Sequence, residues 1–432
     1  MTRIALCVSA LLAFGCGDDS SPGATGGAGG GEPMPDAAPP MPDGPDHGAP
    51  STMYPAFAPD MAQIAHNGGP VLSAMQIVTI TWTSDTNAAM YEAYGDGIGA
   101  SDYWHQINAE YGVGPSVSGA ANHVHITTMP PTTMSDSDIQ TLIQTSVADT
   151  TLHWPQPNNQ ILYAVYLPQG TDLDLGGSAC SQGIGGYHDQ TQVGTSNVSY
   201  AVLPNCSGRS SSVLSAASHE FNEAATDPLP QSNPGWVGFD DNHISFEFFQ
   251  ELQDETGDAC EFFRSSFYTD METAFNYPVQ RQWSNASAHG GHNPCVPVPS
   301  GAFFNVTPFP ADQDTIMVNL RAIGAGNHAT KGFKGQLMTP RTFAVGFYSD
   351  ADTGGPWTLS ASVQTSLFSS IGSTVSNGTA DIAIDKTMGQ NGEKAYITVT
   401  PKTFNSMGVI YIELVSQLGT AKHYMPILIG QN

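Results

Sequence analysis

The sequence predicts a mixed α/β domain followed by an all-β sandwich, behind an N-terminal segment that belongs to neither. Strand-like and helix-like stretches alternate between residues 53 and 300, and short Thr/Ser-rich alternating segments take over from residue 301. Residues 17–52 contain almost no bulky apolar side chains. The alternation is typical of an α/β (α+β) layer, whereas short strands separated by turns are typical of an Ig-like β-sandwich.

Composition and charge restrict the classes of partner. The chain has 432 residues, which is more than one ordinary domain, and 12 Lys plus Arg stand against 39 Asp plus Glu for a formal net charge of -27. Binding to a nucleic-acid backbone depends on clustered basic residues, so we expect no nucleic-acid partner. The acidic excess is typical of a solvated surface that keeps an exported protein soluble.

Residues 1–16 have the features of a lipoprotein-type signal peptide. The apolar run from Ile4 to Phe14 follows Arg3 and is too short to span a bilayer as a stable helix. It ends in LAFGC, which resembles a bacterial lipobox and makes Cys16 the candidate for lipidation. Ala13 stands where that motif usually has leucine, so plain secretory cleavage is the alternative.

An export signal of this kind predicts a protein of the cell envelope, such as an outer-membrane lipoprotein, or an extracellular one. Lipidated Cys16 would hold it to the membrane, because several acyl chains on one residue anchor stably. Residues 17–52 are rich in Gly, Pro, Ala and Asp, cannot bury a core, and are predicted to form a disordered tether.

Four further cysteines indicate the compartment independently. Cys180, Cys206, Cys260 and Cys295 allow two disulfides with three connectivities in an exported chain. We favour Cys180 with Cys206 and Cys260 with Cys295, because each pair brackets a loop-rich segment beside the candidate site. The chain has no CxxC pair, which argues against a zinc site made of four cysteines.

The elements expected before the candidate site alternate in type. Apolar or β-branched runs predict strands in the second half of 71–82 and at 123–128, 160–167 and 197–203. Helices are expected at 88–111, interrupted around 95–99, and at 135–149, where Ser135 and Asp138 have capping-box spacing. The glycine-rich stretch before residue 190 is interpreted as a turn-rich excursion.

One predicted helix carries the candidate site. It begins near Ser211 or Ser212, ends before Pro228 and contains SHEFNEAATDP. His219 and Glu223 are four residues apart and therefore share a helix face, which is how HExxH helices hold zinc with the intervening glutamate as general base. We expect a zincin-like domain with His219 and Glu223 as zinc ligands and Glu220 as the base, all facing a cleft.

A third ligand is expected from SFEFFQELQDETGDAC, because six of the twelve glutamates lie between Glu220 and Glu261. Glu255 is the first choice, with Glu251 and Asp258 as competitors. Asp227 or Asp258 could instead hydrogen-bond His219 from outside the ligand set.

Other residues are expected around the same cleft. Tyr187, His188 and His243 are candidates for stabilising a developing oxyanion. The strand at 197–203 arrives just before the helix, so we expect it to run along the cleft and pair with an extended peptide.

Several motifs resemble a known family. HNGGPVLSAMQIVTITW, YWHQINAEYGVG, and SHEFNEAATDP followed by GW and ETGDAC are similar to the phosphate-induced, EXORDIUM-like family of extracellular proteins and its bacterial relatives, over roughly residues 66–295. The resemblance places these residues on family motif positions: His219, Glu220, Glu223, Thr226, Asp227, Glu255, Gly257, Asp258 and Cys260. The resemblance implies a site but does not identify a reaction. This chain also has a longer insertion, VGFDDNHISFEFFQELQD, between the tryptophan of GW and the GD-x-C segment.

Two function classes follow from these residues. The first is a cell-surface zinc-dependent hydrolase, a metallopeptidase with His219, Glu223 and Glu255 as ligands and Glu220 as general base. The alternative is a non-catalytic EXORDIUM-like surface protein, in which the metal is structural and the β domain binds glycan or protein partners. A calcium-stabilised acidic domain is a third class, but the chain lacks an EF-type loop.

Overall fold

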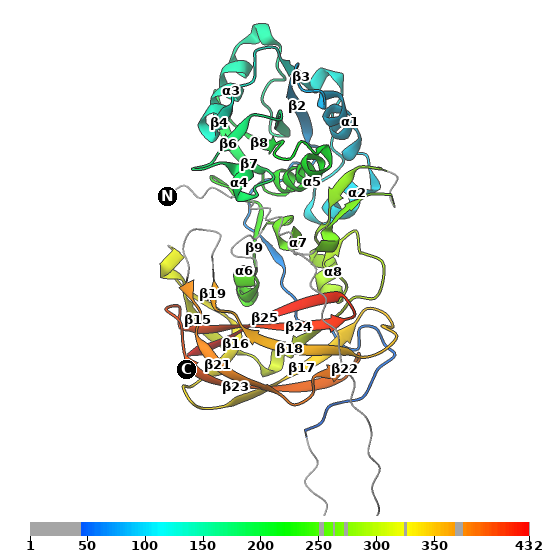
Figure 1. Cartoon of the computed structure of the whole chain (residues 1–432), viewed down its shortest axis with the longest axis vertical. Helices are drawn as coiled ribbons and strands as arrows, with labels where there is room; N and C mark the ends of the chain where they lie inside the picture. The colour runs from blue at the N-terminus through cyan, green and yellow to red at the C-terminus, as the bar shows by residue number, and fades with distance from the viewer. Residues whose placement is uncertain are drawn as a thin grey trace, which may run out of the picture.

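The computed structural model describes residues 45–249, 255–261, 264–271, 275–323, 326–367 and 375–431. An α/β unit and a β-sandwich lie one above the other in Figure 1. The predicted signal peptide, Cys16, the tether up to residue 44, and the competing ligand Glu251 lie outside the described residues.

A five-stranded mixed sheet forms the centre of the α/β unit, as the alternation of elements predicted. Its strand order is β3-β2-β5-β8-β7, with bounds His123–Ile126, Gln76–Trp82, Ile161–Leu167, Ser196–Pro204 and Tyr187–Val193. The first four strands run parallel, and β7 is antiparallel to β8. Every residue of β5 is buried, as expected for a parallel strand with both faces covered.

Helices cover both faces of this sheet. The core on one face contains side chains of α1 (Ala88–Ile98), α2 (Asp102–Asn108) and α5 (Ser210–Thr226). The core on the other face contains side chains of α3 (Asp136–Ala148), which begins at the predicted capping box of Ser135 and Asp138. The helical material is interrupted, as predicted, but the break lies at residues 99–101 and not around 95–99, since α1 ends at Ile98 and α2 begins at Asp102.

One expectation about the sheet is wrong. The strand at 197–203 is β8, which lies inside the sheet between β5 and β7, so it cannot offer an edge to a peptide. The edge strand is β7, which the sequence analysis placed in a turn-rich excursion. Its sequence, YHDQTQV, is mostly polar, yet five of its seven residues are buried. A strand is predicted from the periodicity of its apolar residues, so a strand whose buried side chains are mostly polar is missed.

Two sheets form the β-sandwich, as the short alternating segments after residue 301 predicted. One sheet has the order β14-β17-β23-β21, with bounds Phe304–Pro308, Arg341–Ser349, Lys394–Thr403 and Thr379–Ile384. The other has the order β15-β16-β25-β24-β18-β22, with bounds Asp314–Asn319, Asn327–Gly335, Ala421–Gln431, Val409–Leu418, Trp357–Val363 and Met388–Gly389.

Shorter elements complete the two units and the junction between them. The paired strands are β1 (Ile64–His66) with β9 (Trp236–Phe239), β4 (Thr133–Ser135) with β6 (Asp172–Asp174), β10 (Phe267–Thr269) with β11 (Pro278–Gln280), β12 (Gln282–Trp283) with β13 (Cys295–Val296), and β19 (Ser366–Leu367) with β20 (Val375–Ser376). The short helices are α4 (Ala179–Gln182), α6 (Ser245–Phe249), α7 (Asp258–Glu261) and α8 (Asn285–Gly290).

The two units share one core, although the sequence suggests separate domains at 53–300 and 301–432. Helix α6, from the insertion that follows Trp236, packs on β24 and β25 of the sandwich. Its Phe246 belongs to the same buried cluster as Trp283 of the α/β unit and Phe347 of the sandwich. The end of the predicted tether also differs from expectation, because residues 47–53 are hydrogen-bonded to the sandwich.

Candidate metal centre

Helix α5 carries the HExxE pattern but does not present it to an open cleft. Its residues from Ala217 to Thr226 are all buried, with His219 only 3% exposed and Glu223 fully buried. The helix ends at Thr226, and Asp227 is its C-cap directly before Pro228, as predicted from the restriction that proline places on the preceding residue. The face that was expected to line a cleft is instead covered by β7 and by the segment that contains α7.

Seven buried side chains meet above this helix and form what we call the His-carboxylate cluster. The members are two histidines and five carboxylates: His188, His219, Glu220, Glu223, Asp227, Glu255 and Asp258. They come from β7, α5, the residue after α5, and the segment at 255–258.

The first ligand set within the cluster surrounds His219. Its Nε2 atom lies 3.0 Å from Oε1 of Glu223 and 3.4 Å from Oδ1 of Asp258. Bonds of about 2.0–2.2 Å from zinc to imidazole nitrogen and carboxylate oxygen place ligand atoms about 3–4 Å apart. These three side chains could therefore hold one metal ion, as their ligand atoms all lie within 4.8 Å of one another.

The orientation of the His219 ring is set by Gln280. The Gln280 amide donates through Nε2 to the carbonyl oxygen of Gly257 at 2.8 Å, which leaves its Oε1 to accept from Nδ1 of His219 at 2.9 Å. The proton of neutral His219 is thereby held on Nδ1, and the lone pair on Nε2 faces the carboxylates of Glu223 and Asp258. Metal-binding histidines are usually held by a hydrogen bond of this kind.

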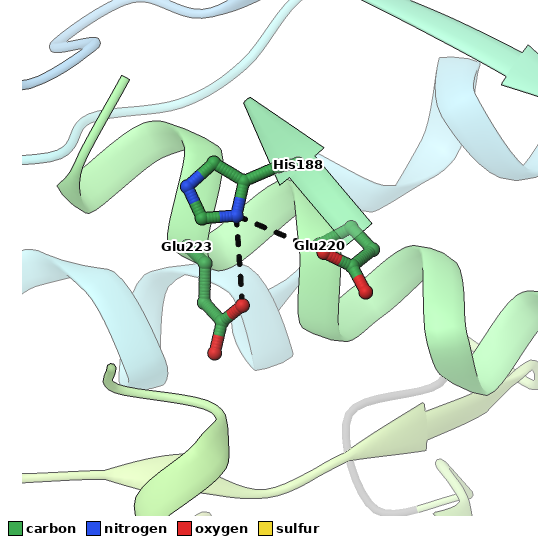
Figure 2. A group of neighbouring side chains, drawn as sticks. All are labelled: His188, Glu220 and Glu223. Atoms are coloured by element: carbon green, nitrogen blue, oxygen red, sulfur yellow. Dashed lines mark ion pairs between the residues drawn. The ribbon is translucent and has the colours of Figure 1, made fainter. Parts of the chain in front are cut away.

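The second ligand set surrounds His188 on β7. Its Nδ1 atom lies 3.7 Å from Oε2 of Glu220 and 3.7 Å from Oε2 of Glu223, and Figure 2 shows the ring facing both carboxylates. Its Nε2 atom donates to the backbone carbonyl of Asp227 at 3.1 Å. The ligand atoms of His188, Glu220 and Glu223 also lie within 4.8 Å of one another.

The pKa values in the cluster show how strongly its charges interact. Burial by itself lowers the pKa of both histidines, but the surrounding carboxylates raise the pKa of His188 and of His219 well above the usual value. Burial raises the pKa of Glu220 and of Glu255. The pKa of Glu223 is lowered against the effect of burial, because both histidines lie beside its carboxylate.

The cluster contains more negative charge than its own histidines can balance. Five carboxylates face at most two imidazolium ions, and Oε2 of Glu220, Oε2 of Glu255 and Oδ2 of Asp227 are buried without a hydrogen bond. Burying unbalanced carboxylates is costly, so the arrangement favours either protons or a bound cation. The donor set of imidazole nitrogen and carboxylate oxygen fits zinc.

Two glycines allow the backbone to approach the carboxylates closely. A Cβ atom at Gly257 would lie 2.7 Å from Oε1 of Glu223 and 2.8 Å from Nδ1 of His219. A Cβ atom at Gly186 would lie 2.8 Å from Oε1 of Glu220. Both glycines therefore leave the space that the candidate ligands occupy.

The structure brings most of the predicted site residues together, in a different grouping from the one expected. His219 and Glu223 are joined by Asp258, the competitor, whereas Oε1 of Glu255 lies 3.7 Å from Nε2 of His188. His188 was considered only for the oxyanion, and no local spacing connects it with α5.

The other candidates for the oxyanion have partners away from the cluster. Tyr187 donates through its hydroxyl to Asp136 at 2.7 Å. His243 lies between Asp240 and Asp60, with its Nδ1 atom 2.8 Å from Asp240 Oδ2. Neither residue contributes to the His-carboxylate cluster.

Both predicted disulfides are confirmed. Cys180 is bonded to Cys206, and Cys260 is bonded to Cys295. Cys260 lies in α7 two residues after Asp258, so the second disulfide holds the segment that supplies a candidate ligand. Two disulfides indicate an oxidising or extracellular compartment. Among the helices of the described residues, none is both long enough and apolar enough to cross a membrane.

Comparison with known proteins gives little further information. No family model and no curated protein matches the chain. An endo-fucoidan hydrolase from glycoside hydrolase family 107 shares 12% identity over 30% of this chain and 23% of its own, with a TM-score of 0.16. Domains 4 and 5 of the S-layer protein SbsC share 13% identity over 38% of this chain and 98% of theirs, with a TM-score of 0.15. At these TM-scores, neither structure indicates the fold or the function of this chain.

Proposed function

We propose that this protein is an exported zinc-dependent hydrolase, and that peptide bonds are its substrate class. The observation that carries the proposal is the pair of His219 and Glu223 on one helix, with Nδ1 of His219 held by Gln280 and its Nε2 facing the carboxylate of Glu223. Asp258 is assigned as the third ligand in place of Glu255, because Asp258 faces Nε2 of His219 at 3.4 Å.

A zinc ion at this place would supply Lewis-acid chemistry, polarising a carbonyl group and lowering the pKa of a water molecule. The chain itself supplies a proton acceptor beside it. Burial raises the pKa of Glu220, which brings this carboxylate closer to the range in which it can both accept and release a proton near neutral pH. His188 lies against the same carboxylate and orients it.

The experiment is metal analysis of the purified protein combined with peptide cleavage by the wild type and by Glu220→Gln. We expect the wild type to contain zinc and to cleave peptides. The variant should keep the ion held by His219, Glu223 and Asp258, and should lose cleavage by at least about a hundredfold, as is typical when general acid–base catalysis is removed. A protein without bound metal would overturn the proposal.

Burial of the cluster favours a second candidate, which is a structural metal centre in a non-catalytic surface protein. Glu220 is only 1% exposed and Glu223 is fully buried, and a structural zinc site, unlike a catalytic one, needs no open position for water or substrate. The β-sandwich would then bind a glycan or protein partner. Zinc without peptide cleavage, together with a large fall in melting temperature on chelation, would support this candidate instead.

We also propose that lipidated Cys16 holds the protein at the cell envelope. The lipobox-like end of the signal peptide supports this proposal, and the two disulfides are consistent with export. The resemblance to the EXORDIUM-like family stays a prediction.

A further inference from the structure

Glu223 belongs to both ligand sets and offers a different oxygen to each. Its Oε1 atom lies 3.0 Å from Nε2 of His219, and its Oε2 atom lies 3.7 Å from Nδ1 of His188. We propose that the cluster holds two divalent cations bridged by the carboxylate of Glu223. This inference rests on the proposed function, because the first ion is the zinc assigned to His219, Glu223 and Asp258.

The second ion would be held by His188, Glu220 and Glu223. Nε2 of His188 donates to the carbonyl of Asp227, a group that can only accept, so the lone pair of neutral His188 is on Nδ1. That atom points between Oε2 of Glu220 and Oε2 of Glu223, at 3.7 Å from each. With the ring neutral, the lone pair of Nδ1 and the two carboxylate oxygens all face the space that a cation would occupy.

The bridging oxygen Oε1 of Glu223 is already fixed in place. It accepts hydrogen bonds from the backbone N–H groups of Gly257 and Asp258, each at 3.1 Å, and it faces His219. Its partner Oε2 faces the other histidine. A carboxylate held in this way presents its two oxygens to opposite sides, as a bridging ligand does.

The charge of the cluster also favours two ions over one. With both histidines neutral and five carboxylates ionised, one divalent cation leaves three negative charges in a buried site, whereas two leave one. Oε2 of Glu255 is buried without a hydrogen bond, and its Oε1 lies 3.7 Å from Nε2 of His188. The carboxylate of Glu255 therefore lies beside the His188 ring, at the nitrogen that does not face the proposed second ion.

The second ion changes the role of one residue. Glu220 becomes a ligand through Oε2, so the loss of cleavage in Glu220→Gln would follow from the loss of that ion. The first ion keeps its three ligands in this variant, and the metal content of the same variant therefore distinguishes one ion from two.

The test counts metal ions in the full exported chain. Protein stripped with a chelator, dialysed against excess zinc and freed of unbound metal should contain two zinc ions per chain in the wild type. His188→Ala and Glu220→Gln should each contain one. His125→Ala is the matched control, because His125 is also on a sheet strand and faces a glutamate, Glu92 at 3.1 Å, but lies outside the cluster. It should contain two.

Each outcome decides between the proposals. One zinc ion per wild-type chain overturns the inference and leaves the proposed function standing, whereas no zinc overturns both. Two ions in the wild type and also in both variants place the second ion elsewhere and overturn the inference. If the variants fail to fold, X-ray absorption of the zinc-loaded wild type decides, since a bridged pair gives metal–metal scattering at about 3.5–4 Å and separate ions do not.

Discussion

A single methyl group at residue 257 should disturb the candidate metal centre. Gly257→Ala would place a carbon atom less than 3 Å from Glu223 and His219, which neither buried side chain can avoid without moving. We expect at least a tenfold loss of zinc affinity, measured by competition with a chelating dye, and a lower melting temperature. Gly355→Ala is the control, because nothing lies within 4 Å of a Cβ atom there. Equal zinc affinity in the two variants would contradict the assignment.

Contacts between residues of the same helix could be predicted from the sequence, whereas contacts between different elements could not. His219 and Glu223 meet because they are one helical turn apart. His188 reaches the same carboxylate from β7, and no local pattern relates a residue on a strand to a helix that begins more than twenty positions later. Whether Glu255 or Asp258 is the third ligand depends on the path of the chain after the insertion, and the spacing of residues along the sequence does not determine that path.

At the scale of elements, the short helix α7 depends on the Cys260–Cys295 disulfide. The two cysteines are 35 residues apart, and loop-closure entropy for such a separation corresponds to about 3–4 kcal/mol. The double variant Cys260→Ser, Cys295→Ser should therefore lose stability to denaturant by that amount and should also bind zinc more weakly, because α7 carries Asp258.

The other disulfide provides the comparison for this prediction. Cys180 and Cys206 are 26 residues apart, so the corresponding double variant should lose a similar amount of stability. Neither cysteine lies in an element that supplies a ligand of the first set, and zinc affinity should change less. Similar losses of zinc affinity in the two double variants would show that α7 does not depend on its own disulfide.

Elements with strong local signals were predicted correctly. Helix α3 begins at a capping box, α5 ends before a proline, and β5 is a continuous apolar run, so each has a signal within its own sequence. Strand β7 has no such signal, because its buried positions include His188 and Asp189. His188 is buried in the cluster and Thr191 is hydrogen-bonded to Gln140 and Gln144 of α3, and these contacts exist only in the folded chain.

At the scale of the whole molecule, the two units are held together by a charged group as well as by their shared core. His243 lies between Asp240 and Asp60, and Asp60 also pairs with Lys331 of the sandwich at 2.7 Å. Burial by itself lowers the pKa of His243, but these two aspartates raise it above the usual 6.5. Burial by itself raises the pKa of Asp60, but His243 and Lys331 lower it.

These shifts predict how the junction responds to pH. A histidine whose pKa is raised on folding contributes stability that is fully present below its unfolded pKa of about 6.5 and is lost as the pH rises through its folded pKa. The aspartates contribute stability above about pH 4 that is lost in acid. His243→Gln should therefore lower the melting temperature most between about pH 4.5 and 6.5 and least at about pH 9. A difference that does not vary with pH would contradict this account.

The shared core is the feature of the whole molecule that composition could not reveal. The change in sequence composition near residue 301 correctly marks the start of the sandwich. However, Phe246, Trp283 and Phe347 belong to one buried cluster that crosses this boundary. Contacts between residues that are a hundred positions apart leave no periodic signal.

The N-terminal end of the described chain determines which part of the molecule would face outward at a surface. His47 and Lys394 exchange hydrogen bonds, and Asn391 of the sandwich holds Ser51. An anchor placed before residue 45 would therefore pull on the sandwich first, and the α/β unit that contains the His-carboxylate cluster would lie beyond the sandwich (Figure 1). The sandwich would then separate the α/β unit from the surface that holds the anchor.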